Sequence, residues 1–319
     1  MTTTVTPGVR LSALPPAAGR AGLRGALASE YTKIRSVRST YWTLGALFVV
    51  SVGLGVAIAA GTSANWDNHP FQKVGFDATQ TSLGVFFEIG QLIIAVLGAM
   101  VITSEYSTGM IRTSLSAQPR RGVVYAAKAI VFAAVTLVIS LITAFTAFFS
   151  VMAVYASTGV AVSLFHTARI PENARLDCLQ RVQMGPSQFR CLRGNLVVTG
   201  WQLIHPTTVL AAIIGTALFV TLVALIAFGV GALVRHTAGA IAIVIALMFI
   251  IPILENALPS NWHNDIQRFL PDAANQIVSV TVKNSVDHLW TAWPQLGVTA
   301  LWAAALVGIG AYLFRKRDA

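Results

Sequence analysis

Few residues of this chain of 319 amino acids have the types and spacing that enzyme chemistry requires. The sequence contains no GxxxxGK(S/T) phosphate-binding loop, no HExxH zinc motif and no GxSxG nucleophile motif. These motifs are common signatures of nucleotide-binding enzymes, zinc proteases and serine hydrolases. Its two cysteines form no CxxC motif or Cys/His cluster that would indicate a metal site. We therefore expect that this chain is not an enzyme and holds neither a cofactor nor a metal.

One carboxylate falls within a long apolar run, where an ionisable side chain normally faces water or a charged partner. Glu88 is followed by Gln91, and residues three apart lie on about the same face of a helix. This pair is therefore a candidate for lining a translocation pathway. Alternatively, Glu88 lies only about one to two helical turns inside the run and extends to the outer lipid headgroups. The sequence leaves both interpretations open.

A second candidate site is the polar segment Ser104–Lys128, which joins two apolar runs. It begins Ser-Glu-Tyr-Ser-Thr-Gly-Met-Ile-Arg-Thr-Ser-Leu and continues through Pro119, Arg120 and Arg121. An amphipathic, cation-rich segment of this kind offers a short rigid element to a soluble partner, and Gly109 permits a bend or a close approach. The alternative is that its cations only mark the cytoplasmic side of the membrane.

The elements that must position these residues are predicted to be membrane-spanning helices. The chain is 55% apolar and only 11% charged, whereas soluble domains contain about 25% charged residues. Six runs are long and apolar enough to cross a bilayer as helices, which takes about 20 residues. They are Tyr41–Gly61, Leu83–Thr103, Ile130–Tyr155, Thr207–Val234, Ala238–Leu254 and Leu296–Phe314. The predicted fold class is an all-α membrane protein with six transmembrane helices.

The distribution of charge predicts the orientation of these spans. With both termini in the cytoplasm, the inner segments hold fourteen basic residues but only three acids, Glu30, Glu105 and Asp318. The outer segments hold eight residues of each sign. This asymmetry follows the positive-inside rule, so both termini are predicted to be cytoplasmic. Anionic lipid headgroups account for the net charge of +10 better than nucleic acid does.

Three further segments complete the predicted organisation. Residues 1–22 are predicted to be a disordered cytoplasmic tail, and residues 23–319 a transmembrane domain. Within this domain, Leu23–Ser39 has apolar residues at helical spacing and a basic polar side, which is typical of an amphipathic helix in the inner membrane interface. Before the last span, Glu255–Pro294 contains apolar residues at helical spacing that Pro271 interrupts, which predicts short outer helices.

The largest outer segment, residues 156–205, is too long for a simple connection. It contains Cys178 and Cys191, and two thiols close in sequence usually pair in an oxidising compartment. We therefore predict an extracytoplasmic cap tied by a Cys178–Cys191 disulfide, with two free thiols as the alternative. Closing a loop of this size contributes about 3 kcal/mol of stability on chain-entropy arguments.

The segment that follows Ser104 resembles the coupling loop in the permease subunits of ABC-2-type exporters. In that family the loop carries a Glu, a Gly followed by hydrophobic residues, a Leu, a Pro and basic residues before a Lys. The residues that match this pattern are Glu105, Gly109, Arg112, Leu115, Pro119, Arg121 and Lys128. The resemblance covers about Leu23–Arg317, including the interface helix, the six spans and the short outer helices. The long outer segment of residues 156–205 departs from the simplest members of the family.

The resemblance implies that this chain is one transmembrane half of an ATP-driven exporter in the cell membrane. Two ATP-binding subunits, which carry the ATP and Mg²⁺, would dock on the coupling helix, and a second permease subunit, identical or paralogous, would complete the pathway. The substrate would be hydrophobic or amphipathic: a drug, an antibiotic, a lipid or a lipid-linked precursor. Membrane lipids are expected partners and nucleic acids are not. The alternative is a non-transporting membrane sensor or scaffold whose outer cap binds a ligand.

Overall fold

A computed structural model describes residues 22–65, 78–117, 120–157, 189–192, 195–198, 206–255, 257–259, 262, 266, 269–271 and 292–316. Residues 1–21 of the predicted tail lie outside this part of the chain. Most of the predicted cap and most of the predicted outer helices also lie outside it. The described residues form a helical bundle together with elements that flank its spans.

Six helical segments of the described part are long and apolar enough to cross a membrane, which confirms the predicted fold class. They are α2 (Arg38–Ala64), α4 (Ala78–Ser107), α6 (Arg121–Ser157), α8 (Pro206–Val234), the continuous segment Thr237–Glu255 and α13 (Ala292–Lys316). Each contains one of the six apolar runs. Helix α6 begins well before its run, so Lys128 lies on the same helix as the third span.

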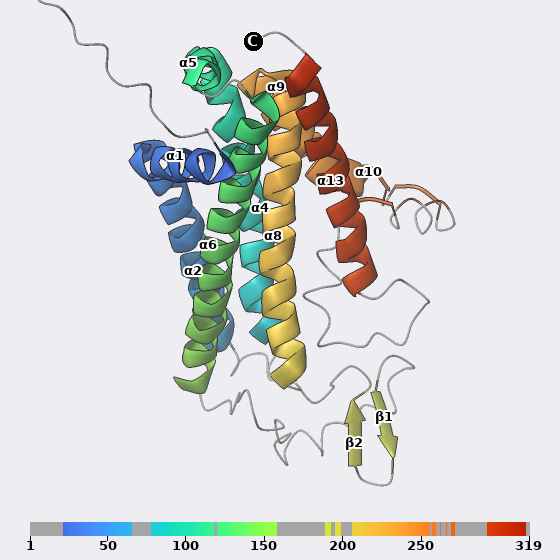
Figure 1. Cartoon of the computed structure of the whole chain (residues 1–319). Helices are drawn as coiled ribbons and strands as arrows, with labels where there is room; N and C mark the ends of the chain where they lie inside the picture. Colours follow the sequence, from blue (N-terminus) through green and yellow to red (C-terminus); the bar gives the residue numbers. More distant parts are fainter. Residues whose placement is uncertain are drawn as a thin grey trace, which may run out of the picture.

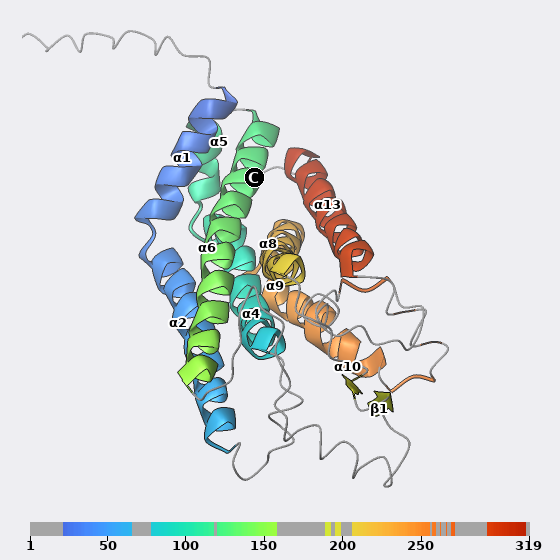
Figure 2. The same ribbon diagram turned by 90° about the horizontal axis from the view of Figure 1, so that it is seen from below.

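Helices α4 and α8 form the centre of the bundle (Figure 1). Figure 2 shows α2 and α6 on one side of this pair and α13 on the other. The central place of α8 follows from its composition, because Ala217, Ala224 and Ala227 are fully buried along it. Small side chains of this kind let neighbouring helices approach closely, which is how helices pack within a membrane.

The fifth span is built from three consecutive pieces. Helix α9 (Thr237–Ile245) leads into a π-helical turn, η1 (Ala246–Ile250), and then into α10 (Ile251–Glu255). Pro252 is the second residue after the π-helical turn and cannot donate a backbone hydrogen bond, which disturbs the regular ladder of the helix. The apolar run Ala238–Leu254 predicted a span here but not this irregularity.

One end of the bundle carries two short helices. Helix α1 (Leu23–Ser36) lies crosswise to the spans and packs against α6, and α5 (Met110–Ala117) lies beyond the end of α4 (Figure 1). The last turn of α13 is at the same end, which we call the α5 end. The predicted helix Leu23–Ser39 stops at Ser36, because Val37 adopts an extended conformation and Arg38 already belongs to α2. The change of direction at Val37 is what lets α1 lie across the bundle.

Two described pieces belong to the predicted outer segments. Strands β1 (Phe189–Leu192) and β2 (Asn195–Val198) pair antiparallel within the predicted cap. Cys191 lies in β1 and Cys178 lies outside the described residues, so the disulfide stays a prediction. Near the last span, Gln295 Nε2 donates to the backbone oxygen of Leu270 at 3.1 Å. That contact ties a described piece of the segment before α13 to α13 itself.

Candidate functional site

The candidate site begins at the turn between α4 and α5. The hydroxyl of Thr108 donates to the backbone oxygen of Ser104 at 2.8 Å, and the backbone N–H of Thr108 donates to the same oxygen at 3.1 Å. Gly109 then has a φ of 71°, the left-handed conformation in which glycine commonly ends a helix. A Cβ at Gly109 would meet no atom within 4 Å. The backbone bend, and not a close approach, therefore requires glycine here.

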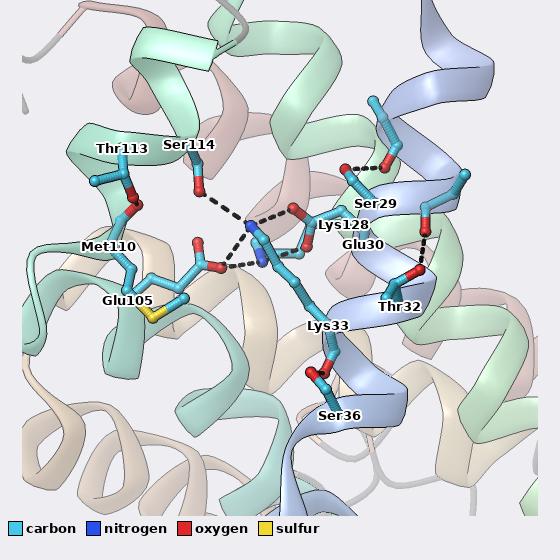
Figure 3. A network of polar contacts seen from close by, with 12 residues as sticks. Ser29, Glu30, Thr32, Lys33, Ser36, Glu105, Met110, Thr113, Ser114 and Lys128 are labelled. Atoms are coloured by element: carbon cyan, nitrogen blue, oxygen red, sulfur yellow. Dashed lines mark hydrogen bonds and ion pairs between the residues drawn. The ribbon is translucent and has the colours of Figure 1, made fainter.

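Two carboxylates and two ammonium groups meet where α1, α4 and α6 come together (Figure 3). Lys128 Nζ donates to Glu30 Oε2 at 2.5 Å and to Glu105 Oε1 at 2.7 Å. Lys33 Nζ donates to Glu30 Oε1 at 2.8 Å and to Glu105 Oε1 at 3.2 Å. We call these four residues the charge network. Each of its charges contacts both charges of the opposite sign, so the network is neutral as a whole.

The charge network is largely shielded from water. The side chains of Glu30, Lys128 and Glu105 are 3%, 6% and 8% exposed, and that of Lys33 is 29% exposed. A charge in such surroundings costs several kcal/mol unless it is paired and hydrogen-bonded. The network therefore depends on all four members. If one is removed, a buried charge of the opposite sign is left without compensation.

Lys33 keeps its positive charge over the physiological pH range. Burial lowers the pKa of Lys33, but its hydrogen bonds and charge interactions with Glu30 and Glu105 outweigh this effect and hold the pKa above its ordinary value. A raised pKa in the folded state contributes stability that is fully present below the ordinary pKa. That contribution is lost only as the pH rises through the raised value. Deprotonation of Lys33 therefore does not open the network near neutral pH.

The network extends to α5 through one hydrogen bond. Lys33 Nζ donates to Ser114 Oγ at 3.0 Å (Figure 3). Ile111 is 4% exposed and Leu115 packs partly buried against the bundle core. These three residues of α5 have the spacing i, i+3 and i+4, so one face of the helix is turned to the bundle. Met110 and Thr113 are exposed on α5, and we call them the exposed face of α5.

The turn between the fourth and fifth spans contacts the residues that precede α5. The guanidinium carbon of Arg235 lies 4.9 Å from the ring centroid of Tyr106, within the range of a cation–π interaction. Thr237 Oγ1 donates to Thr103 Oγ1 at 2.9 Å. His236 caps α9, since its Nδ1 accepts a hydrogen bond from the N–H of Gly239. The α8–α9 turn is thus fastened to the last turns of α4.

The structure brings only some of the predicted site residues together. Glu105 lies in the charge network and Gly109 forms the turn, while Arg112 and Leu115 lie on α5. Arg121 begins α6, and Pro119 lies outside the described residues. The predicted coupling role of these residues stays a prediction.

Glu88 and Gln91 lie apart from the charge network, within the α4 span. Glu88 is exposed and Gln91 is 4% exposed, so the two side chains have different surroundings although they are one turn apart. Their place in a pathway also stays a prediction. Among the described residues, no group of three or more His, Cys, Asp and Glu side chains could hold a metal.

Glu30 and Lys33 were not among the predicted site residues, although both belong to the charge network. This segment was predicted to be an amphipathic helix in the membrane interface. Its apolar residues Leu23 and Tyr31 are 46% and 54% exposed, whereas Glu30 is buried. Glu30 could have been singled out because acidic residues are rare in the inner segments. Glu30 and Glu105 are two of only three acids assigned to the inner segments, and an acid among so many cations is a natural partner for them.

The comparison with known families bears on this same part of the chain. Residues 26–170 match the family described as ABC-2 family transporter protein. The matched range contains the whole charge network, the Gly109 turn and α5. The match covers somewhat less than half of the chain and supports an ABC-2-type permease, so we refer to the chain as the permease. No curated protein matches it. A permease of this family is a multi-pass membrane protein that works with an ATP-binding ABC subunit.

Proposed function

We propose that the permease is one transmembrane half of an ATP-driven exporter, and that α5 is the helix on which the ATP-binding subunit docks. The observation that supports this proposal most directly is the setting of α5. It is a helix of eight residues that follows a left-handed glycine, packs on the bundle through one face and exposes the other. Figure 1 shows it at the end of the bundle, beyond the spans.

A displacement of α5 would reach the spans by two routes. The first is the Gly109 turn, through which α5 continues directly from α4. The second is the contact of Ser114 with Lys33, which joins α5 to α1 and, through Glu30 and Glu105, to Lys128 of α6. Movement of a docked ATPase would therefore act on three helices at once. In this proposal Glu105 transmits the movement inside the permease, because its carboxylate is bound by two lysines of the same chain.

The remaining parts of the machine belong to other chains in this proposal. The permease sequence has no P-loop, so ATP and Mg²⁺ are bound by two ATP-binding subunits. A second permease, identical or paralogous, completes the pathway in the cell membrane. The apolar character of the spans favours a hydrophobic or amphipathic substrate, such as a drug, an antibiotic, a lipid or a lipid-linked precursor.

The substitution Met110→Asp is expected to abolish capture of the ATP-binding subunit while leaving the permease folded. Met110 is 47% exposed, so an aspartate is tolerated in the free permease, but docking would bury its charge in a contact made for an apolar side chain. The measurement is co-purification of a co-expressed ATP-binding ABC subunit with affinity-tagged permease. Thr32→Asp is the matched control, because Thr32 is exposed on α1 at the same end of the bundle.

Two results would contradict the docking proposal. Equal capture by wild type and Met110→Asp would show that the exposed face of α5 is not the contact. Failure of the wild-type permease to capture any ATP-binding subunit would instead favour the non-transporting sensor or scaffold.

We also propose that the α5 end faces the cytoplasm. In a background that carries Cys178→Ser and Cys191→Ser, a cysteine at Ser116 is expected to resist a membrane-impermeant maleimide in intact cells and to react after permeabilisation. A cysteine at Asn65, which is exposed at the opposite end of α2, is expected to react in intact cells. Labelling of the Ser116→Cys variant from outside would overturn this orientation.

A further inference from the structure

A cleft of about 630 Å³ lies at the α5 end, apart from the charge network. It is formed by the beginnings of α1 and α6 and the last turn of α13. Three guanidinium groups line it together with apolar side chains. Besides Gly122, the lining residues are Arg120, Arg121, Arg315, Leu23, Val123 and Ala126. This combination of several cations with an apolar wall suits a ligand that has an anionic group and a hydrocarbon part.

The wall of the cleft is built so that Arg315 lies against the first turn of α6. A Cβ at Gly122 would lie 2.5 Å from Arg315 Nε and 2.6 Å from Arg315 Nη2. Only a residue without a side chain leaves this space to the guanidinium group. Arg315 and Arg121 both line the cleft, and the N-terminal end of α6 adds the positive end of a helix dipole. Like charges gathered in this way favour a bound anion.

Aromatic residues indicate the level of the cleft in the membrane. Tyr41 and Trp42 in the first turn of α2 are 56% and 80% exposed, and Tyr312 on α13 is 60% exposed. Exposed tyrosine and tryptophan rings at the ends of spans prefer the headgroup region of the bilayer. Tyr312 precedes Arg315 by three residues, so the two lie about one turn apart on α13. The cleft therefore opens where phospholipid headgroups are found.

We propose that this cleft binds one anionic phospholipid, with the guanidinium groups on its phosphate and the first part of its hydrocarbon chains along Leu23, Val123 and Ala126. Guanidinium groups suit phosphate because they offer paired N–H donors in a fixed plane. The lipid bridges α1, α6 and α13. Because α1 also carries Glu30 and Lys33, a lipid that binds only the folded permease stabilises the whole α5 end by mass action.

The test uses full-length permease purified in detergent and mixed with either phosphatidylglycerol or phosphatidylcholine. Native mass spectrometry counts the retained lipid, and thermal unfolding measures the stabilisation. We expect wild-type permease to retain one phosphatidylglycerol and to gain a higher Tm than with phosphatidylcholine. The double variant Arg121→Gln with Arg315→Gln is expected to lose phosphatidylglycerol affinity by at least about tenfold, because each charge-assisted contact is strong.

Two matched variants separate a built site from diffuse attraction. Arg24→Gln with Arg35→Gln removes the same charge from exposed positions of α1 outside the cleft lining and is expected to retain the lipid. Gly122→Ala keeps every charge but displaces Arg315, and is expected to weaken retention. The proposal would be overturned if both arginine double variants lost the lipid equally. It would also be overturned if Gly122→Ala and the Arg121→Gln, Arg315→Gln variant both retained the lipid fully. Stabilisation by inorganic phosphate equal to that by phosphatidylglycerol would also overturn it, since the ligand would then be a free anion.

Discussion

Replacing Lys128 by methionine is expected to destabilise the folded permease by about 3–5 kcal/mol, the typical cost of breaking a buried ion pair from one side. Lys128 bonds both carboxylates of the charge network, and its side chain is 6% exposed. Without it, Glu30 and Glu105 share only the charge of Lys33. The measurement is thermal or denaturant unfolding of the purified permease in detergent, together with its yield in membranes.

A second substitution distinguishes lost charge balance from lost packing. Adding Glu105→Gln to Lys128→Met removes one carboxylate and makes the network neutral again, so this double variant is expected to recover part of the stability. Coupling between contacting residues is typically about 0.5–3 kcal/mol. Lys33→Met is expected to cost less than Lys128→Met, because the side chain of Lys33 is 29% exposed. A Lys128→Met variant as stable as wild type would show that the network does not hold α1, α4 and α6 together.

The network matters beyond stability because of the helices it connects. Glu30 and Lys33 come from α1, Glu105 from the end of α4, and Lys128 from the first turns of α6. Helix α5 has only a short face on the bundle, through Ile111, Ser114 and Leu115. Loosening the network would free Ser114 from Lys33 and leave α5 attached through its turn and the apolar contacts of Ile111 and Leu115. A permease in that state could still insert into the membrane but would hold α5 less firmly.

The six spans could be predicted from the sequence because their signal is local. A run of about 20 apolar residues has few alternatives to a membrane helix, and each predicted run lies inside one continuous helical segment of the structure. The ends of the helices were less predictable. Val37 is a single extended residue that separates α1 from α2, and no composition change marks it. The π-helical turn near Pro252 likewise leaves only a weak local signal.

The charge network could not be predicted in full because it depends on how α1 is turned about its axis. The sequence predicted an amphipathic helix in the membrane interface but not which of its residues face the bundle, where the buried positions are Ala26 and Glu30. A membrane-facing helix exposes its apolar side to lipid, so its polar side is the one left for the bundle. Glu30 faces the bundle because it pairs with Lys128, which lies ninety-eight residues further along the chain.

The surroundings of Glu105 bear on how its predicted role can be tested. The resemblance placed Glu105 among the residues of the loop that couples to the ATP-binding subunit. In the structure the side chain is buried and its Oε1 accepts hydrogen bonds from Lys33 and Lys128. A substitution at Glu105 would therefore change stability and α5 position together. Gly109 is the cleaner position for a test of coupling, because its side-chain space is empty.

Substitution of Gly109 by valine is expected to leave membrane insertion intact but to weaken coupling to the ATP-binding subunit. The measured quantity is the ATP hydrolysis of the co-purified complex in excess of that of the isolated ATP-binding subunit. We expect this excess to fall by about 5- to 150-fold. Gly109 has a φ of 71°, and a β-branched residue there costs about 1–3 kcal/mol of strain. The strain is relieved if the turn opens, which moves α5 away from the position in which Ser114 meets Lys33. The expected fold-change is the strain energy converted into the decrease in the fraction of permease molecules whose α5 is correctly placed.

A series at this one position makes the argument specific to the backbone. Asparagine, alanine and valine all add a Cβ to the same empty space, but asparagine tolerates the left-handed conformation best and valine worst. Coupled hydrolysis is therefore expected to fall in the order Gly, Asn, Ala, Val, while the amount of permease in the membrane stays constant. Equal activity across the series would mean that the turn does not position α5. Equal loss in all three would mean that the surface of the turn contacts the partner, and that its backbone conformation is not what matters.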